Sequence, residues 1–102
     1  MKSKETQLTE FKTIWKDEYL KWVCGFANSQ GGFLFIGVDD NGVVVGAENA
    51  QKLFEDIPNK IVSVMGLVVN VDLKREGEKE FISVQIPISS FPVAYHGKYY
   101  YR

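Results

Sequence analysis

Residues 26–40 constrain the fold of this chain more than any other segment, because they join a helix end to an apolar strand through a glycine turn. Apolar residues recur at helical spacing over 19–27 and follow two acidic residues at 17–18, which predicts a buried amphipathic helix. The Asn and Gly residues of 28–32 tolerate the left-handed backbone angles that end a helix. Residues 33–38 are apolar on both faces, so we expect a central strand that is covered on both sides.

An Asn-Gly pair at 41–42 follows this strand and predicts a tight hairpin. Asn-Gly between two extended runs is typical of a two-residue type I′ turn. In that register Asp40 pairs with Val43, and Asp39 pairs with Val44.

Five further segments have the apolar pattern of a helix or a strand. Residues 53–65 repeat at helical spacing, and Pro58 within them predicts a kink or two short helices that meet near Ile57. Four segments are interpreted as strands: 10–15, 67–74, 80–88 and 99–102. The resulting order, β-α-β-β-α-β-β-β, predicts an α+β fold in which two main helices pack on a single mixed β-sheet.

The composition predicts one domain, residues 1–102, with a single hydrophobic core. The 12 basic and 13 acidic residues give no overall positive field, so nucleic-acid binding would require a local patch. The only cysteine, Cys24, is interpreted as a core residue, which fits a reducing compartment. The chain has no apolar signal region and no run of about 20 apolar residues, so we expect a cytoplasmic domain without a membrane partner.

Most enzyme motifs are missing. Gly32 and Gly37 have the spacing of a P-loop, but Val38 and Asp39 stand where Lys and Ser or Thr would be needed to bind phosphate and magnesium. One histidine, His96, and one cysteine cannot supply the ligands of a structural zinc site. These absences favour a protein that is not an enzyme.

Carboxylates are the remaining candidates for chemistry. Glu5, Glu10 and the pair Asp39 and Asp40 offer the oxygen ligands that Mg²⁺ and Mn²⁺ prefer, and such ions assist phosphodiester cleavage. An offset of five residues places Glu5 and Glu10 on opposite faces of a regular strand, so their convergence requires a bend between them. The spacing alone favours solvated surface acids.

Basic and aromatic residues near the two ends are candidates for nucleic-acid contact. Lys12, Lys98 and Arg102 could contact phosphates, and the tyrosines at 99–101, Tyr100 among them, offer rings that stack on unpaired bases. Alternate tyrosines of a strand point to opposite faces, so at least one should pack into the core.

Taken in order, these features resemble the Schlafen and AlbA-like DNA-binding domain, formerly called a divergent AAA domain. The resemblance covers nearly the whole chain, and five features carry it: Glu-Phe-Lys at 10–12, the acid at 17, the run at 26–40, Asn-Gly at 41–42 with Val-Gly at 45–46, and Tyr-Tyr-Arg at 100–102. It implies a nucleic-acid-binding module, with DNA as the expected partner. It also implies the N-terminal part of a transcriptional regulator that continues into a downstream domain.

Two alternatives to a binding module stay open. A mammalian Schlafen branch has a carboxylate nuclease site, which implies a divalent-metal-dependent nuclease that uses Glu5, Glu10 and Asp39, and less directly Asp40, with Mg²⁺ or Mn²⁺. The Schlafen enzyme builds that site within a duplicated assembly, which one copy cannot reproduce alone. The other alternative is a self-association module, a homo-oligomer that pairs through the aromatic C-terminal strand.

Overall fold

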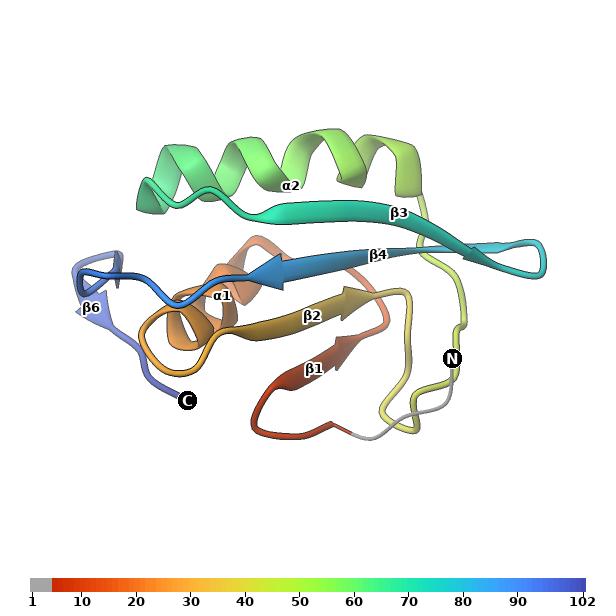
Figure 1. Ribbon diagram of the computed structural model, residues 1–102. Helices are drawn as coiled ribbons and strands as arrows, with labels where there is room; N and C mark the ends of the chain where they lie inside the picture. The colour runs from red at the N-terminus through yellow and green to blue at the C-terminus, as the bar shows by residue number, and fades with distance from the viewer. Residues whose placement is uncertain (1–4) are drawn as a thin grey trace.

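The computed structural model describes residues 5–102, and it confirms the predicted α+β class (Figure 1). The polar start of the chain, residues 1–4, lies outside the described residues. Four strands form one mixed sheet in the order β1-β2-β4-β3, in which β1 is parallel to β2 and the other neighbours are antiparallel. The bounds of these strands are β1 Thr9–Lys12, β2 Gly32–Ile36, β3 Asn70–Glu76 and β4 Lys79–Ile86.

Two helices and a small hairpin complete the fold. A 3-10 turn, Asp17–Tyr19, leads into helix α1, and the longer helix α2 connects β2 to β3. Near the C-terminus, β5 and β6 pair as a separate two-stranded sheet. Their bounds are α1 Leu20–Ala27, α2 Ala50–Met65, β5 Ala94–Tyr95 and β6 Lys98–Tyr99.

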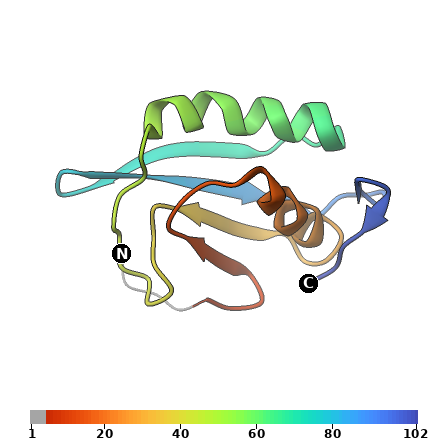
Figure 2. The ribbon, with the colours of Figure 1, turned by 180° about the vertical axis from the view of Figure 1, so that it is seen from behind.

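Both helices pack on the same face of the four-stranded sheet, as the view from behind shows (Figure 2). Each helix is amphipathic and directs its apolar side toward the strands. The main core lies between these two layers, and its fully buried members include Val23, Phe26, Leu34, Ile36, Ile57, Ile61, Ile82 and Val84. Within residues 5–102, no helix is long and apolar enough to span a membrane.

A second, smaller apolar cluster covers the other face of β2, so this strand is central and buried on both sides as predicted. Phe11 and Phe35 lie with ring centroids 5.8 Å apart, and Phe81 contacts Phe35 from β4. Val38 and Val44, from the segment that follows β2, complete this cluster.

The glycine turn between α1 and β2 is required by sterics. Gly31 has a φ of 70°, and a Cβ at this position would lie 2.7 Å from the carbonyl oxygen of Ile86. Any other residue would therefore force β4 and the turn apart.

The hairpin predicted at 41–42 is wrong in register and in extent. Val38, not Asp39, pairs with Val44, and the pairing is a single bridge instead of a strand. A type I′ turn needs positive φ at both central residues, but in this segment only Gly42 has one. The physical reason lies in Asp39, whose side chain accepts hydrogen bonds from backbone amides and holds a wider turn.

Two other details differ from expectation. α2 is one helix, because Pro58 lies within Ala50–Met65 without ending it. The final strand is β6, Lys98–Tyr99, so residues 100–102 are not strand, and they run back along α1 through hydrogen bonds to Asn28 and Ser29.

Candidate nucleic-acid interface

The guanidinium of Arg102, predicted to contact phosphate, is occupied by the protein itself. Its Nε donates to the carbonyl oxygen of Gln7 at 2.8 Å, and one Nη donates to the carbonyls of Thr6 and Thr9 at 2.8 and 3.1 Å. The same Nη lies 3.0 Å from Oε1 of Glu10, and the side chain is only 12% exposed. Arg102 therefore ties the C-terminal residue to the edge of β1, and few of its donors remain for a phosphate.

Lys12 is also held within the fold. Its Nζ lies 3.5 Å from Oε2 of Glu10, and it lies 4.8 and 5.2 Å from the ring centroids of Tyr19 and Trp22. The guanidinium of Arg102 lies 5.2 Å from the same Trp22 ring. Lys12 and Arg102, both predicted to contact phosphates, thus form a cluster of cation-π contacts and ion pairs beside α1.

Glu5 and Glu10 converge, because the chain bends between them. Thr6 and Thr9 form an isolated antiparallel bridge, which folds residue 5 back along β1. There Glu5 accepts a hydrogen bond at 3.0 Å from the backbone N–H of Phe11, and its carboxyl is hydrogen-bonded to that of Glu10. The chain therefore has the bend between Glu5 and Glu10 that their convergence requires.

The two carboxyls have pKa values displaced in opposite directions. Burial, followed by the hydrogen bond and the charge of Glu5, raises the pKa of Glu10 above its ordinary value. Burial acts in the same direction on Glu5, but hydrogen bonds from Glu10 and from the Phe11 amide, with the charges of Lys12 and Arg102, hold the pKa of Glu5 below its ordinary value. The pair therefore shares one proton over the pH range between its two values.

Replacing Glu10 with Gln should flatten the pH dependence of stability. Because the pKa of Glu10 is raised in the folded state, its stabilisation is complete below the ordinary value of 4.5 and is lost as the pH rises through the folded pKa. Gln keeps the neutral form and its hydrogen bonds, so between pH 4.5 and 7 the variant should lose less stability than the parent. Urea unfolding over this range measures the difference, with Glu55→Gln in α2 as an exposed control; parallel curves for parent and Glu10→Gln would contradict the shared proton.

The structure does not bring Asp39 and Asp40 to this pair. Asp39 accepts hydrogen bonds at 2.9 and 3.0 Å from the amides of Asn41 and Val43, and Asp40 is exposed on the same turn. Over residues 5–102, no three His, Cys, Asp or Glu side chains lie close enough together to hold a metal ion. Two of the four predicted carboxylates therefore meet, while Asp39 caps a turn and Asp40 is exposed on it.

Asn28, predicted only as a helix end, fixes the C-terminal segment to α1. Its amide nitrogen donates to the carbonyl oxygens of Val93 and Tyr100 at 2.7 and 2.9 Å, and its amide oxygen accepts from the N–H of Val93 at 2.7 Å. Cys24, fully buried as predicted, donates its S–H to the same Val93 carbonyl. Backbone groups distant in sequence are thus satisfied by one side chain.

The three C-terminal tyrosines divide between core and solvent. Tyr100 packs on the main core beside Tyr95, which confirms that one ring of the run is internal. Tyr99 and Tyr101 are 58% and 67% exposed, and Lys98 is exposed beside them. Tyr99 and Tyr101 therefore replace Tyr100 as the rings that a base could reach.

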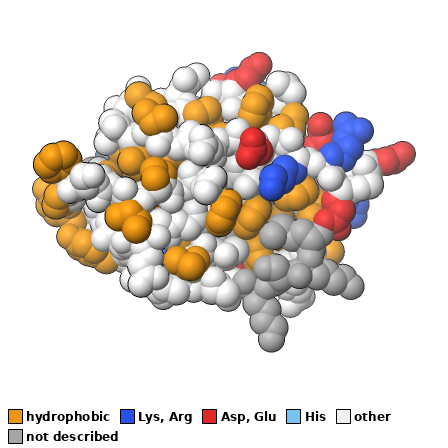
Figure 3. All heavy atoms as spheres, in the orientation of Figure 1, with side chains coloured by type: hydrophobic (Ala, Val, Ile, Leu, Met, Phe, Trp, Pro, Cys, Tyr) orange, Lys and Arg blue, Asp and Glu red, His pale blue; other side chains and the backbone are white. Residues whose placement is uncertain are grey.

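The C-terminal segment that contains these tyrosines has no acidic residues. Glu80 is the last acidic residue, so residues 81–102 contain none, and residues 19–38, which include α1 and β2, contain none either. Phe91 and Ile88 are 79% and 64% exposed in the same segment. On the face drawn in Figure 3, red and blue side chains gather toward the β3–β4 hairpin, and the opposite end shows hydrophobic and uncharged surface. The lack of acidic residues over 81–102 is a signal in the sequence that could have identified this segment, including Phe91, as a candidate site.

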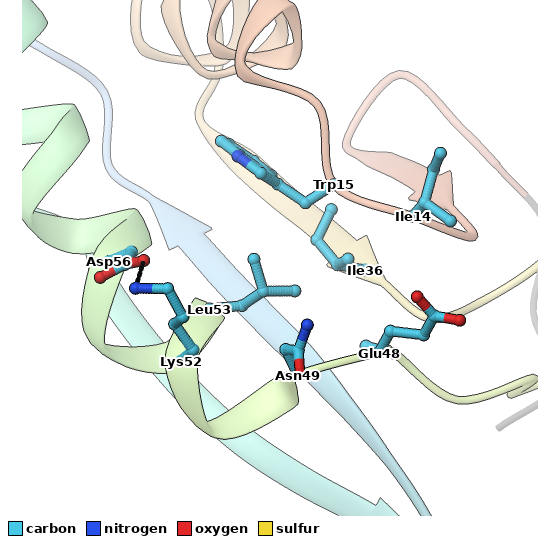
Figure 4. A pocket seen from close by; sticks show the side chains of 9 residues that line it. Ile14, Trp15, Ile36, Glu48, Asn49, Lys52, Leu53 and Asp56 are labelled. Carbon is cyan, nitrogen blue, oxygen red and sulfur yellow. Dashed lines mark ion pairs between the residues drawn. The ribbon is translucent and has the colours of Figure 1, made fainter.

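A cavity of about 360 Å³ lies elsewhere, between the β1–α1 connection and the start of α2 (Figure 4). Trp15 and Leu53 form part of its apolar wall. Its polar side includes Glu48 and the pair of Lys52 and Asp56, whose charges lie 3.0 Å apart. No residue predicted to bind nucleic acid lines this cavity, and its two carboxylates oppose a phosphate.

Comparison with known proteins gives a family match and similar solved structures. Residues 5–102 match the family described as Schlafen, AlbA_2. The N-terminal domain of a Nitrosomonas europaea protein described as related to the ATP-dependent DNA helicase RecG is 24% identical, with a TM-score of 0.74 over 96% of this chain and 79% of that one. The DIP2311 protein from Corynebacterium diphtheriae is 21% identical, with a TM-score of 0.70 over 93% of this chain and 20% of that one. At these identities both structures show the fold alone, and the comparison with curated proteins found no match.

Proposed function

The chain belongs to the Schlafen, AlbA_2 family, and from this we propose that it is a nucleic-acid-binding domain that binds DNA as a module of a cytoplasmic transcriptional regulator with a downstream domain. The observation that carries this proposal is the C-terminal end of the molecule. There Phe91, Tyr99 and Tyr101 are exposed beside Lys98, in a segment without a single acidic residue.

This end meets two requirements for contact with nucleic acid. Phosphates are repelled by carboxylates, so a chain with a net charge of −1 can approach them only where acids are missing. Exposed rings stack on bases, and such stacking contributes about 1–3 kcal/mol per base. Since Lys12 and Arg102 are engaged internally, the rings should contribute more to affinity than phosphate contacts do.

Fluorescence titration with single-stranded and duplex oligonucleotides at low salt tests the proposal. Tyr101→Leu should weaken binding about fivefold or more, since one stacking ring is lost. Lys98→Ala should weaken it less and should lower the salt dependence, because one phosphate contact is lost. Lys79→Ala, an exposed lysine on the β3–β4 hairpin, is the matched control and should leave affinity unchanged. The proposal fails if no oligonucleotide binds, or if Lys79→Ala has as large an effect as Lys98→Ala.

A second candidate, a nuclease that uses Mg²⁺ or Mn²⁺, is favoured by one observation, the convergence of Glu5 and Glu10. It would require further oxygen ligands from a second chain or from the nucleic acid, because Asp39 is engaged in its turn. Incubation of labelled RNA and DNA with each ion, with Glu10→Gln as the comparison, would detect it. Cleavage unaffected by Glu10→Gln would exclude these carboxylates.

A further inference from the structure

β3 is an edge strand, and β4 is its one strand neighbour among the described residues. It is seven residues long, and it pairs only with β4. Within the described part of the chain, no backbone hydrogen bond outside the strand ladders involves residues 70–75. A strand edge of this length offers a row of N–H and C=O groups for another strand to pair with.

The hydrogen-bonding pattern identifies which backbone groups face this edge. The carbonyl of Glu80 accepts a hydrogen bond from the amide of Ala47, on the side of β4 away from β3, so the backbone groups of Glu80 and of its partner Arg75 do not bond to each other. Because the pattern alternates along an antiparallel pair, Arg75, Leu73 and Val71 direct their N–H and C=O groups outward. Three alternate residues therefore direct a backbone donor and a backbone acceptor out from this edge.

The charged side chains of β3 are self-complementary in one register. Asp72 and Lys74 flank Leu73 and lie on the sheet face away from the helices. Lys74 is opposite Phe81 of β4, and Phe81 belongs to the small apolar cluster on that face. If a second β3 runs antiparallel with Leu73 opposite Leu73, then Asp72 of each chain lies opposite Lys74 of the other. The outward-facing residues Val71 and Arg75 then form hydrogen-bonded pairs, while Asp72 and Lys74 form the closer, non-hydrogen-bonded ones.

Apolar surface lies beside this edge. Val62 is 48% exposed on α2, two residues from Lys60, which pairs with Asp17 near α1. A separation of two residues is about 200° around a helix, so Val62 lies on the side of α2 that faces away from α1. Val68, 76% exposed, lies in the connection from α2 to β3. A second chain at the β3 edge would approach both valines.

We propose that two copies of this chain pair antiparallel through β3 about a twofold axis at Leu73, joining two four-stranded sheets into one of eight strands. Charges on an edge strand commonly prevent pairing, but here one register brings Asp72 opposite Lys74 on both sides of the axis, and the registers with Asp72 opposite Asp72 or Lys74 opposite Lys74 are opposed by like charges. This interface uses the outer edge of β3, and it includes none of Phe91, Lys98, Tyr99 and Tyr101 of the proposed nucleic-acid site. It would place two such sites on one dimer.

Sedimentation equilibrium over a range of concentrations tests the pairing with three samples besides the parent. D72K creates two Lys–Lys contacts and K74D creates two Asp–Asp contacts, so each should raise the dimer dissociation constant about tenfold or more. Mixing D72K with K74D chains restores both opposite-charge contacts and should give a heterodimer about as stable as the parent dimer. Circular dichroism establishes that each variant is folded.

Amide hydrogen exchange gives a second measurement. The Leu73 N–H, which faces solvent in a monomer, should exchange more slowly as the parent concentration rises. The proposal is overturned if the parent is monomeric throughout, if the two charge reversals leave a dimer unchanged, or if the mixed chains do not associate. If the chain dimerises through another surface, the two charge reversals should leave the dimer unchanged.

Discussion

Replacing Arg102 with Ala is expected to lower the free energy of unfolding by about 3 kcal/mol, because the change removes the donor to the Gln7 carbonyl and one donor each to Glu10 and to the carbonyls of Thr6 and Thr9. The side chain and its carboxylate partner are both nearly buried, at 12% and 11% exposed, so water replaces the lost contacts poorly. Urea or thermal unfolding of parent and variant measures the loss.

Two controls separate this effect from a simple change of charge. Arg102→Lys keeps the charge but not the planar fork of donors, so it should recover only part of the stability. Arg75→Ala removes an exposed arginine whose ion pair with Glu80 spans 3.4 Å, and it should change stability by less than about 0.5 kcal/mol. If Arg102→Ala is as mild as Arg75→Ala, Arg102 is a surface group that is free for other partners.

Replacing Asn28 with Ala is expected to lower the free energy of unfolding by about 2–4 kcal/mol, because three short hydrogen bonds to Val93 and Tyr100 are lost and their backbone groups are partly buried. The exposed Asn59 of α2 makes one hydrogen bond at 3.1 Å, so Asn59→Ala is the matched control and should have little effect. Urea unfolding compares the two variants.

Asn28→Ala should also loosen the C-terminal hairpin before the rest of the domain unfolds. The amides of residues 93–101 would then exchange with solvent faster than those of β4. Equal protection of both segments in the variant would show that Asn28 does not hold the hairpin.

The parts of the fold that depend on neighbouring residues could be predicted from the sequence. α1, the glycine turn and β2 follow from helical spacing, acidic residues in a first turn and a short apolar run, all local signals. The hairpin after β2 was predicted wrongly because the side chain of Asp39 competes with the Asn-Gly preference for a tight turn. That competition depends on a single hydrogen-bonding side chain.

The site was harder to predict because it is built from contacts between distant residues. Arg102 bonds to residues more than 90 positions earlier, and nothing in its neighbours distinguishes such a buried arginine from one that binds phosphate. Glu5 and Glu10 could converge only if the chain bends between them. Their spacing shows that a bend is needed but does not predict that it forms. By contrast, the absence of acids after Glu80 can be counted directly in the sequence.

The central claim is that nucleic acid binds at the acid-free end, and NMR mapping of the backbone amides during titration with a single-stranded oligonucleotide tests it most directly. We expect the largest chemical-shift changes at Phe91 and at residues 98–101, with small changes along β3 and at the cavity beside Trp15. Changes concentrated at that cavity or on the β3–β4 hairpin, with residues 98–101 unaffected, would contradict the claim.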